Sequence, residues 1–564
     1  MFSLTPAIDR LSAFVSASHA RACAFLLLLS LAAFLPGFST LQPIDRDEPR
    51  FAQASKQMLE TGDFIDIRFQ DEARHKKPVG IYWLQAAAVK AGAALGVPEA
   101  RTQIWLYRIP SLIGATATVL LTYWALLAFL SPPLALLGGA LMATAVLLGV
   151  EARIAKTDAV LAACAVASMG ALARTWLDWT RSLAFVPSRR NWLVFWVATA
   201  IGLLIKGPIV PMVWGLAILV LSASQRSFRW LRPLRFGPGL LLCLIVVLPW
   251  FVAIMIKTGG SFFAESVGQD MLGKVAEGQE KHWGPPGLYL IFFFATYWPA
   301  AAFAAMAVPF AWVRRKEPQI LFLIAWILPS WIVFEAVPTK LPHYVLPLYP
   351  AITALLLLAV VNAGIDRHRR GAVATATLVV TVPLALMVVV LFGNWTLDHA
   401  VPWLALPFFA LVLAVGVGIV SAFRRQEFEG ALWRCALAGL LLTLAMYPFA
   451  IESLRSLKLS PRLAAAAKAV GCADPAVITL GYREPSLVFL TGTDLAMAAD
   501  GAQAANFLAQ PGCRVAFVES RFAGAFTTAL ATLPQKPRLL TTIDGFNLNG
   551  GHRLSIAVYA RTPD

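Results

Sequence analysis

Long apolar runs separated by short polar segments dominate the chain and predict helices that cross a membrane. A membrane-spanning helix needs about 20 apolar residues. The first run covers roughly residues 22–38, and because Pro36-Gly37-Phe38 makes a poor cleavage site, we interpret it as an uncleaved helix rather than a signal peptide. The pattern predicts about thirteen spans, the later ones centred near residues 120, 141, 166, 198, 215, 246, 298, 327, 353, 382, 411 and 440.

The composition agrees with this pattern and excludes a soluble enzyme. Hydrophobic residues make up 59% of the 564 residues and charged residues 14%, whereas a soluble globular protein carries about 25% charged residues. The net charge is +16, but the basic residues gather in short clusters between the apolar runs, as topology signals do. We therefore expect contact with membrane lipids, no binding of nucleic acid, and a monomeric protein.

The basic clusters alternate between successive loops and predict the orientation of the chain in its membrane. Lys and Arg residues are retained on the cytoplasmic side. If the N-terminus lies on that side, almost all of the predicted cytoplasmic segments carry a basic cluster. An odd number of spans then places the C-terminus on the outer side. The clusters on the predicted cytoplasmic side lie within residues 174–190, 226–235, 314–316, 367–370 and 424–425.

Three segments predicted on the outer side are too long to be simple connectors. Residues 39–108 mix apolar groups with many charges, which indicates helices lying in the membrane interface, and residues 257–286 form a second long loop. From residue 453 onward the composition becomes that of a small α/β domain of about 110 residues. Its predicted strands are residues 476–480, 514–518 and 554–560, and its predicted helices are residues 461–470 and 501–509.

Two of the six cysteines, Cys472 and Cys513, lie in this predicted outer domain, whereas the others lie in apolar runs. The two could form a disulfide if the compartment is oxidising. Two buried thiols fit the sequence equally well, so the sequence leaves their pairing open.

Acidic residues are scarce, so their positions at the ends of apolar runs are informative. Asp47 and Glu48 follow the first run, and Asp158 stands at the outer end of the fourth predicted helix. A carboxylate at the edge of the hydrocarbon region is costly unless it is paired or functional. For Asp158, helix capping or a salt bridge with Lys156 is an equally good explanation.

Basic residues on the predicted outer side need an explanation, because the orientation rule disfavours them there. A single cavity that holds Asp47, Asp158 and several cations beside the lipid headgroups suits an anionic, lipid-linked substrate. Tyr82 and Tyr344 follow two of these cations and are further pocket candidates. Aromatic belts explain tyrosines at this depth equally well, and the histidines could be exposed interfacial residues. The outer cations are Arg50, Lys76, Lys77, Lys206, His282, Lys340 and His343.

Several motifs resemble those of the GT-C membrane glycosyltransferases and, among them, the bacterial lipid A aminoarabinose transferase family. Asp47-Glu48-Pro49-Arg50 resembles the acidic signature that follows the first helix in the superfamily. The further motifs are similar to family segments and occur in the family's order along the whole chain. They are residues 58–64, 77–83, 156–158, 282–286, 340–347 and 484–489.

The resemblance implies a GT-C fold with thirteen membrane helices and external juxtamembrane helices in residues 1–452, and a periplasmic α/β domain in residues 453–564. It implies a multi-pass protein of the bacterial inner membrane. Such a protein moves a sugar, with inversion, from a polyprenyl phosphate, usually undecaprenyl phosphate, to a cell-envelope acceptor such as lipid A or another glycolipid. Asp47 and Asp158 match the family's essential acids, and Lys77 matches the lysine that engages the donor phosphate.

Three departures from the family pattern bear on which sugar is transferred and on whether a metal ion binds. Lys76 stands where the family commonly has a glutamate associated with metal binding, and Phe51 and Arg74 stand where it has tyrosines. The added cations favour a neutral or acidic sugar, such as a hexose or a uronic acid, over a cationic aminosugar. A divalent cation (Mg²⁺, Mn²⁺ or Zn²⁺) remains open, with Asp47, Asp158 and His282 as candidate ligands.

A transferase of this kind needs cations where negative charge grows on the departing phosphate, and a carboxylate near the anomeric carbon. Asp47 would stabilise oxocarbenium character or accept a proton, and Asp158 would position groups or act as a second base. A phosphate acceptor would need no base. The phosphate-binding candidates are Lys77, Arg50, Lys340, His343 and Lys76, and the other pocket candidates are Glu48, His282, Tyr82 and Tyr344.

A secondary transporter, a lipid flippase or an assembly protein would share the hydrophobic pattern. Transporters place ionisable groups at the middle of the membrane and often contain inverted repeats. The midspan runs 376–390 and 437–446 lack acids, and the two halves of the chain show no repeat. The charged residues gather at one outer rim instead, which favours the transferase interpretation.

Overall fold

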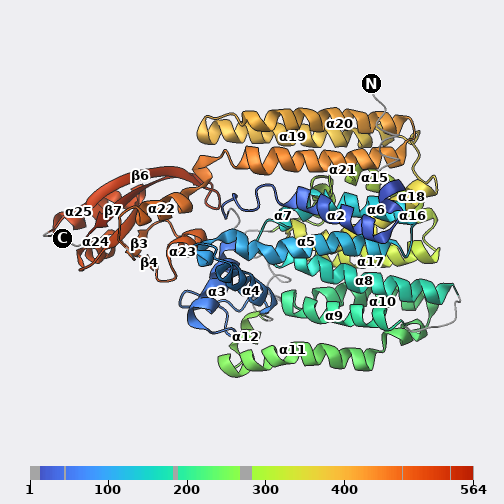
Figure 1. Ribbon diagram of the computed structural model, residues 1–564, viewed down its shortest axis with the longest axis horizontal. Helices are drawn as coiled ribbons and strands as arrows, with labels where there is room; N and C mark the ends of the chain where they lie inside the picture. The colour runs from blue at the N-terminus through green and yellow to red at the C-terminus, as the bar shows by residue number, and fades with distance from the viewer. Residues whose placement is uncertain are drawn as a thin grey trace.

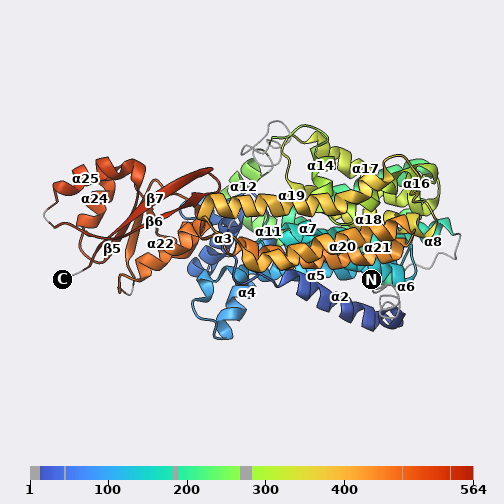
Figure 2. The same cartoon turned by 90° about the horizontal axis from the view of Figure 1, so that it is seen from above.

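Long helices packed side by side make up most of the structure, and a small α/β domain lies at one end of them (Figure 1, Figure 2). The computed structural model describes residues 13–43, 46–181, 188–266, 268, 283–472, 474–533 and 535–562. The first described helix, α2 (His19–Phe34), lies among the helices of the bundle, and the last strand, β7 (His552–Arg561), lies in the α/β domain (Figure 1).

Within these ranges, eight helical segments are long and apolar enough to cross a membrane. They are α5 (Ile104–Leu126), α8 (Asp158–Thr180), α11 (Phe236–Thr258), α17 (Pro318–Ala336), η4 with α18 (Pro342–Leu348 and Tyr349–Val361), α19 (Ala372–Asp398), η5 with α20 (Trp403–Ala405 and Leu406–Arg424), and α21 with η6 (Phe428–Ala445 and Met446–Ile451).

Shorter apolar helices account for the remaining predicted runs. The apolar run near residue 298 is divided among three of them, α14, α15 and α16. Another of them, α9, carries charged residues at both ends. Each apolar run expected from the sequence coincides with at least one helix, so the prediction of a mainly α multi-pass membrane protein is confirmed. These helices are α2 (His19–Phe34), α6 (Pro132–Ala143), α7 (Val146–Glu151), α9 (Arg189–Lys206), α10 (Ile209–Gln225), α14 (Leu288–Thr296), α15 (Ala301–Met306) and α16 (Val308–Val313). The short helix η2 (Arg229–Leu234), which contains two arginines, connects α10 to α11.

The central helix of the bundle is α8, which is buried along most of its length. It is rich in alanine, and small residues allow helices in a membrane to approach closely. Gly114 of α5 lies against the first turn of α8, where an added Cβ would come within 2.6 Å of the backbone nitrogen of Val160. Any larger residue at this position would push α8 away, so Gly114 helps to fix the place of Asp158.

The segment between α2 and α5 forms juxtamembrane elements, as expected for residues 39–108. They are α3 (Asp47–Thr61), the short hairpin β1 (Arg68–Phe69) and β2 (Glu72–Ala73), α4 (Gly80–Ala94) and η1 (Ala100–Thr102). Gly62 ends α3 with a φ of 75°. Of the second expected outer loop, the structure describes α12 (Ser261–Phe263) and a few neighbouring residues, and His282 lies outside the described residues.

The C-terminal domain has its own hydrophobic core around one mixed sheet with strand order β4-β3-β5-β7-β6. β3 pairs in parallel with β4 and β5, and β7 runs antiparallel to β5 and β6. Cys472 and Cys513 form a disulfide beside this sheet. The elements are η7 (Arg455–Leu457), α22 (Leu459–Lys468), β3 (Ala476–Leu480), α23 (Pro485–Thr491), β4 (Ala496–Met497), α24 (Gly501–Ala509), β5 (Arg514–Glu519), η8 (Ser520–Phe522), α25 (Ala523–Ala531), β6 (Arg538–Asn547) and β7 (His552–Arg561).

Candidate active site

Two cavities lie at the end of the bundle that faces the C-terminal domain. The larger has a volume of about 1030 Å³ and is bounded by the start of α3, by α5, α19 and α21, and by the turn between β6 and β7. The smaller has a volume of about 480 Å³ and lies among the loop before α4, the ends of α8 and α9, and α10, α11 and α17. Most of the acids and cations singled out in the sequence line one or the other.

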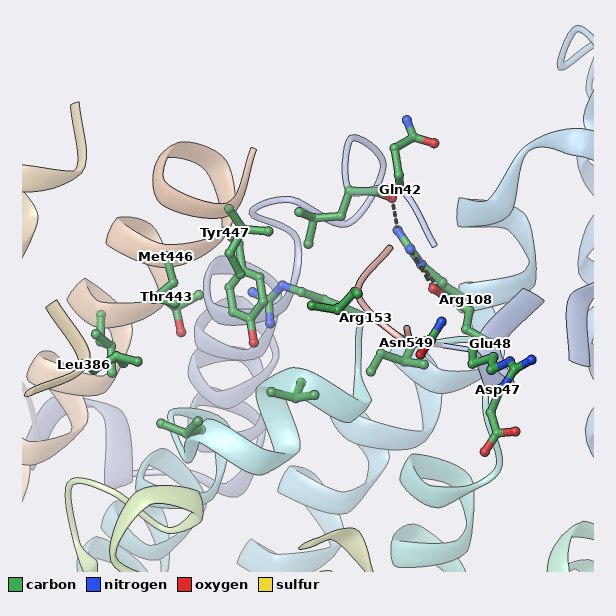
Figure 3. Close-up of a pocket in the computed structure, with 18 of the residues that line it drawn as sticks. Gln42, Asp47, Glu48, Arg108, Arg153, Leu386, Thr443, Met446, Tyr447 and Asn549 are labelled. Carbon is green, nitrogen blue, oxygen red and sulfur yellow. Dashed lines mark hydrogen bonds and ion pairs between the residues drawn. The ribbon is translucent and has the colours of Figure 1, made fainter. Parts of the chain in front are cut away.

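The larger cavity has a charged end and an apolar end (Figure 3). Its described charged lining consists of four arginines and two acids, so a net positive charge faces the space. Leu386, Leu442 and Met446 line the apolar end. The charged lining residues are Arg46, Asp47, Glu48, Arg50, Arg108 and Arg153.

Glu48 is buried and its carboxylate is held by fixed partners. Arg108 donates to it through Nε at 2.7 Å and through Nη2 at 3.0 Å, and the backbone N–H of Ala155 donates to Oε1 at 3.0 Å. Arg108 also donates to the carbonyls of Phe38 and Leu41. Glu48 therefore joins α3 to α5 and to the loop before α8, which suits a structural role better than a chemical one.

Asp47 differs from its neighbour, because its side chain is 41% exposed and its carboxylate points away from the Glu48–Arg108 pair (Figure 3). Its Oδ1 lies 3.6 Å from Nη1 of Arg50. Burial alone would raise the pKa of Asp47, but the positive charges of Lys156, Arg74 and Arg50 hold this pKa below its ordinary value. The carboxylate is therefore ionised at neutral pH inside a cationic surrounding.

Asp158 is the first residue of α8 and lines the smaller cavity. It forms an ion pair with Lys206, the last residue of α9, and its Oδ1 lies 3.7 Å from Nε2 of His343. Lys76 and Lys77 line the same cavity, so three lysines face one carboxylate among its described lining residues. This cavity also carries a net positive charge.

Aromatic and aliphatic groups form the rest of the smaller cavity. Phe251, Phe262 and Phe263 contribute one part of this wall, and Phe334 and Val337 contribute another. The Nζ of Lys206 lies 5.2 Å from the ring centre of Tyr344, a further lining residue, so the tyrosine face stabilises this ammonium group. The cavity thus combines a cationic end with an apolar body.

The expectation that Asp47 and Asp158 share one cavity is wrong, because each lines a different one. Both carboxylates nevertheless interact electrostatically with Lys156 and His343. The side chain of Lys156 is buried, as is that of Asp158. The described linings of the two cavities share no residue, but the carboxylate in each is within electrostatic range of Lys156 and His343, and His343 lines the smaller cavity.

Two predicted pocket residues lie elsewhere. Lys340 is buried and donates to the carbonyls of Phe334 at 3.2 Å, Glu335 at 2.6 Å and Val337 at 2.6 Å, so it caps the C-terminal end of α17. Tyr82 is buried in the core, where its ring stacks on Phe51 at 5.4 Å. Neither residue lies among the described lining of the two cavities.

Sequence reasoning missed Glu151, the last residue of α7. One ligand atom each from Glu151, Asp158 and His343 lie within 4.8 Å of one another, and this group could hold a metal ion. Glu151 follows an apolar run, so the scarcity of acids that singled out Asp158 could also have found it. Of the predicted metal ligands, Asp158 belongs to this group, Asp47 does not, and His282 lies outside the described residues.

The arrangement of helices and domain matches that of solved membrane glycosyltransferases. The crystal structure of ArnT from Cupriavidus metallidurans bound to undecaprenyl phosphate aligns with a TM-score of 0.72 at 17% identity, over 95% of this chain and 97% of that chain. An oligosaccharyltransferase of Archaeoglobus fulgidus aligns with a TM-score of 0.50 at 11% identity, over 88% of this chain and 68% of that chain. This chain therefore has the GT-C fold.

Sequence comparisons indicate one branch of this fold. Residues 76–252 match the family described as dolichyl-phosphate-mannose-protein mannosyltransferase. The undecaprenyl phosphate-alpha-4-amino-4-deoxy-L-arabinose arabinosyl transferase of Erwinia tasmaniensis is 27% identical over 357 residues, which span 63% of this chain and 62% of that protein. The protein of the same name from Pseudomonas aeruginosa strain LESB58 is 26% identical over 451 residues, or 77% of each chain. The predicted resemblance to the aminoarabinose transferases is confirmed, although the Erwinia match spans less than two thirds of that relative.

Proposed function

We propose that this protein is an inverting membrane glycosyltransferase. It moves a sugar from a polyprenyl phosphate, such as undecaprenyl phosphate, to an anionic cell-envelope lipid, such as lipid A or another glycolipid. The observation that carries the proposal is the pair of cavities, each with a cationic end and an apolar end, whose carboxylates Asp47 and Asp158 both interact electrostatically with Lys156 and His343. One anionic lipid in each cavity brings a donor and an acceptor to the same group of charges.

The smaller cavity suits the donor. Lys76, Lys77 and Lys206 provide point charges for a phosphate, and the phenylalanine wall provides an apolar surface for the first isoprenes of the carrier. Lys77 is the residue that matches the family's donor-binding lysine. The ArnT structure of similar fold contains undecaprenyl phosphate, which supports a donor of this class.

The larger cavity suits the acceptor. Arginine forks bind phosphate through two parallel hydrogen bonds, and Arg46, Arg50 and Arg153 line its charged end. Burial lowers the pKa of Arg153 to about 10, so this guanidinium remains charged at neutral pH. Its described partners are the carbonyls of Pro36, Gly149 and Ala33 and the ring of Tyr447, so in the described contacts no carboxylate cancels its charge.

The chemistry follows from the charges that surround Asp47 and Asp158. As the bond between the sugar and the donor phosphate breaks, Lys77 and Lys206 stabilise the negative charge that grows on the leaving phosphate. The ionised Asp47 stabilises the positive character of the anomeric carbon. Asp158 positions Lys206 through their ion pair. A phosphate acceptor is already ionised, so the attack needs no general base.

The group formed by Glu151, Asp158 and His343 offers oxygen and nitrogen ligands that suit Zn²⁺ or Mn²⁺. Lys206 already neutralises Asp158, however, and Lys156 adds a second positive charge nearby. A divalent ion would have to overcome both ammonium groups. We therefore propose that Lys206, and not a metal ion, supplies the positive charge at this position.

The charges near Asp47 support a neutral or acidic sugar. Arg74 and Lys156 are buried and interact with this carboxylate, and Lys76 lines the donor cavity. A protonated aminosugar would add a further positive charge to a region where cations already outnumber carboxylates. A uronic acid or a hexose avoids this repulsion.

The proposed setting is the bacterial inner membrane, with the N-terminus in the cytoplasm and both cavities and the C-terminal domain in the periplasm. The disulfide between Cys472 and Cys513 supports an oxidising compartment for this domain. The separate hydrophobic core that begins at Leu459 supports a domain boundary near residue 452.

Reconstitution of the purified protein in liposomes tests the function. With a radiolabelled polyprenyl-phosphate sugar and a lipid A acceptor, we expect a labelled glycolipid, and faster turnover of a uronosyl than of an aminoarabinosyl donor. Lys77→Ala is expected to lower kcat/KM about a hundredfold, because Lys76 and Lys206 remain beside the phosphate. Labelled donor that crosses the bilayer unchanged would indicate a transporter. Preferential turnover of the aminosugar would contradict the proposed sugar class.

The acid side of the pH profile provides a second test. The guanidinium of Arg74 favours the ionised form of Asp47, so Arg74→Gln is expected to raise the pKa of Asp47 and to move the acid limb of kcat/KM to higher pH. Profiles of the wild type and the variant measured in one buffer series check the direction. Arg68→Gln, which removes an exposed partner of Asp66, is the matched control and should leave the limb in place. A shift of the Arg74→Gln limb to lower pH would contradict this role of Asp47.

A further inference from the structure

The C-terminal domain contributes directly to the larger cavity. The turn between β6 and β7 places Asn549 (Figure 3) and Leu548 in the lining. Arg46, the residue before α3, lines the same space. Glu484 connects these parts. It accepts hydrogen bonds from Nδ2 of Asn547 at 3.2 Å and Nδ2 of Asn549 at 3.0 Å, and its Oε2 lies 3.6 Å from Nε of Arg46.

Glu484 is held in place by the helix that follows it. It occupies the N-cap position of α23, but its side chain makes no capping hydrogen bond, so the carboxylate is available to the turn and to Arg46. α23 is anchored on α3 and α5, because Nζ of Lys56 donates to the carbonyl of Phe489 at 3.1 Å and the Phe489 ring lies 5.2 Å from that of Tyr107. The carboxylate is therefore a fixed point on the domain.

Arg46 is the more exposed partner of this contact. Its side chain is 50% exposed, compared with 12% for Glu484, so one face of the guanidinium remains accessible from the cavity. An arginine held in place loses less conformational entropy when it binds an anion than one that rotates freely. The contact with Glu484 thus prepares Arg46 to receive a phosphate.

We propose that Glu484 is a positioning residue that fixes Arg46 and the β6–β7 turn as the outer wall of the acceptor cavity. Through this wall, the C-terminal domain determines which anionic headgroup enters the acceptor cavity. The class of ligand that the cavity admits is a lipid-linked phosphate. The inference rests on the proposed function, which assigns the larger cavity to the acceptor. It adds a role for the domain in choosing that acceptor, separate from donor binding.

Binding of two probes to the purified full-length protein in detergent tests this role. Glu484→Gln is expected to weaken binding of lipid A about tenfold, as for loss of one charge-assisted contact. Binding of undecaprenyl phosphate should change less than about twofold, because Glu484 is not among the described lining residues of the smaller cavity. Asn549→Ala, which removes one hydrogen bond of the turn, is a milder second variant and should weaken lipid A binding about threefold. Glu99→Gln is the matched control, since it breaks the ion pair with Lys468 at the same domain interface, and it should behave as wild type.

The outcomes separate this inference from the proposed function. Selective loss of lipid A binding in Glu484→Gln and Asn549→Ala, with a raised acceptor KM and an unchanged kcat, supports the positioning role. Equal weakening of both probes would show general loosening of the domain and overturn it. Unchanged lipid A binding in both variants would also overturn it, while leaving the transferase proposal intact if the wild type still glycosylates lipid A. A wild type that binds undecaprenyl phosphate but not lipid A would overturn the acceptor assignment and this inference together.

Discussion

Asp47→Asn is expected to reduce sugar transfer by roughly 10³-fold, the upper range for loss of one transition-state charge contact. Asparagine keeps the shape of the side chain but removes its charge. The ionised Asp47 is surrounded by Lys156, Arg74 and Arg50, so its loss leaves these cations without the carboxylate that offsets them and removes the negative group proposed to face the anomeric carbon. Initial rates in liposomes at saturating donor and acceptor measure the effect on kcat.

A matched acid just beyond the end of α3 provides the control for this substitution. Asp63 pairs with Lys257 and lies outside the described lining of both cavities. Asp63→Asn is therefore expected to keep activity within about twofold. Both variants should elute as folded protein with wild-type yield. Turnover by Asp47→Asn close to that of the wild type would remove the proposed active site.

The length and spacing of the apolar runs were sufficient to predict the helical bundle, because each membrane crossing must satisfy its own backbone hydrogen bonds. Contacts between distant segments were not predictable in this way. The sequence did not show that most of α3 is buried, because its contacts with Gln85 of α4 and Phe489 of α23 join segments that are far apart in the sequence. β6 was missed, since residues 538–542 are all exposed and show no alternation of buried and exposed positions.

For the candidate site, the sequence identified several of the residues but not the directions of their side chains. Scarcity of acids and an unexpected excess of outer cations identified Asp47, Asp158 and Lys77, and all three line a cavity. The same reasoning could not tell where a side chain points. Lys340 satisfies the end of α17 and is not among the described lining residues of either cavity. Glu151 was not singled out, although it too is an acid that follows an apolar run.

The Asp47-Glu48 pair divides into one residue with a proposed chemical role and one that holds the structure. Glu48 and Arg108 are both almost fully buried and make a two-pronged ion pair. Replacing one member of a buried pair leaves the other charge without compensation, which costs more than the pair contributes. Sequence adjacency concealed this difference, because successive residues at the start of a helix point in different directions.

Glu48→Ala is therefore expected to lower the free energy of unfolding by about 3–5 kcal/mol, because Arg108 would stay buried with only carbonyl partners. A large fall in the thermal unfolding midpoint in detergent, measured with undecaprenyl phosphate absent, checks this. Glu317→Ala, which breaks an exposed pair with Arg314, is the control and should change the midpoint little. The double variant Glu48→Leu with Arg108→Met should recover much of the loss, since apolar groups can replace a buried pair. If Glu48→Ala unfolds at the wild-type temperature but loses transfer, Glu48 acts in the chemistry and the division of the pair is wrong.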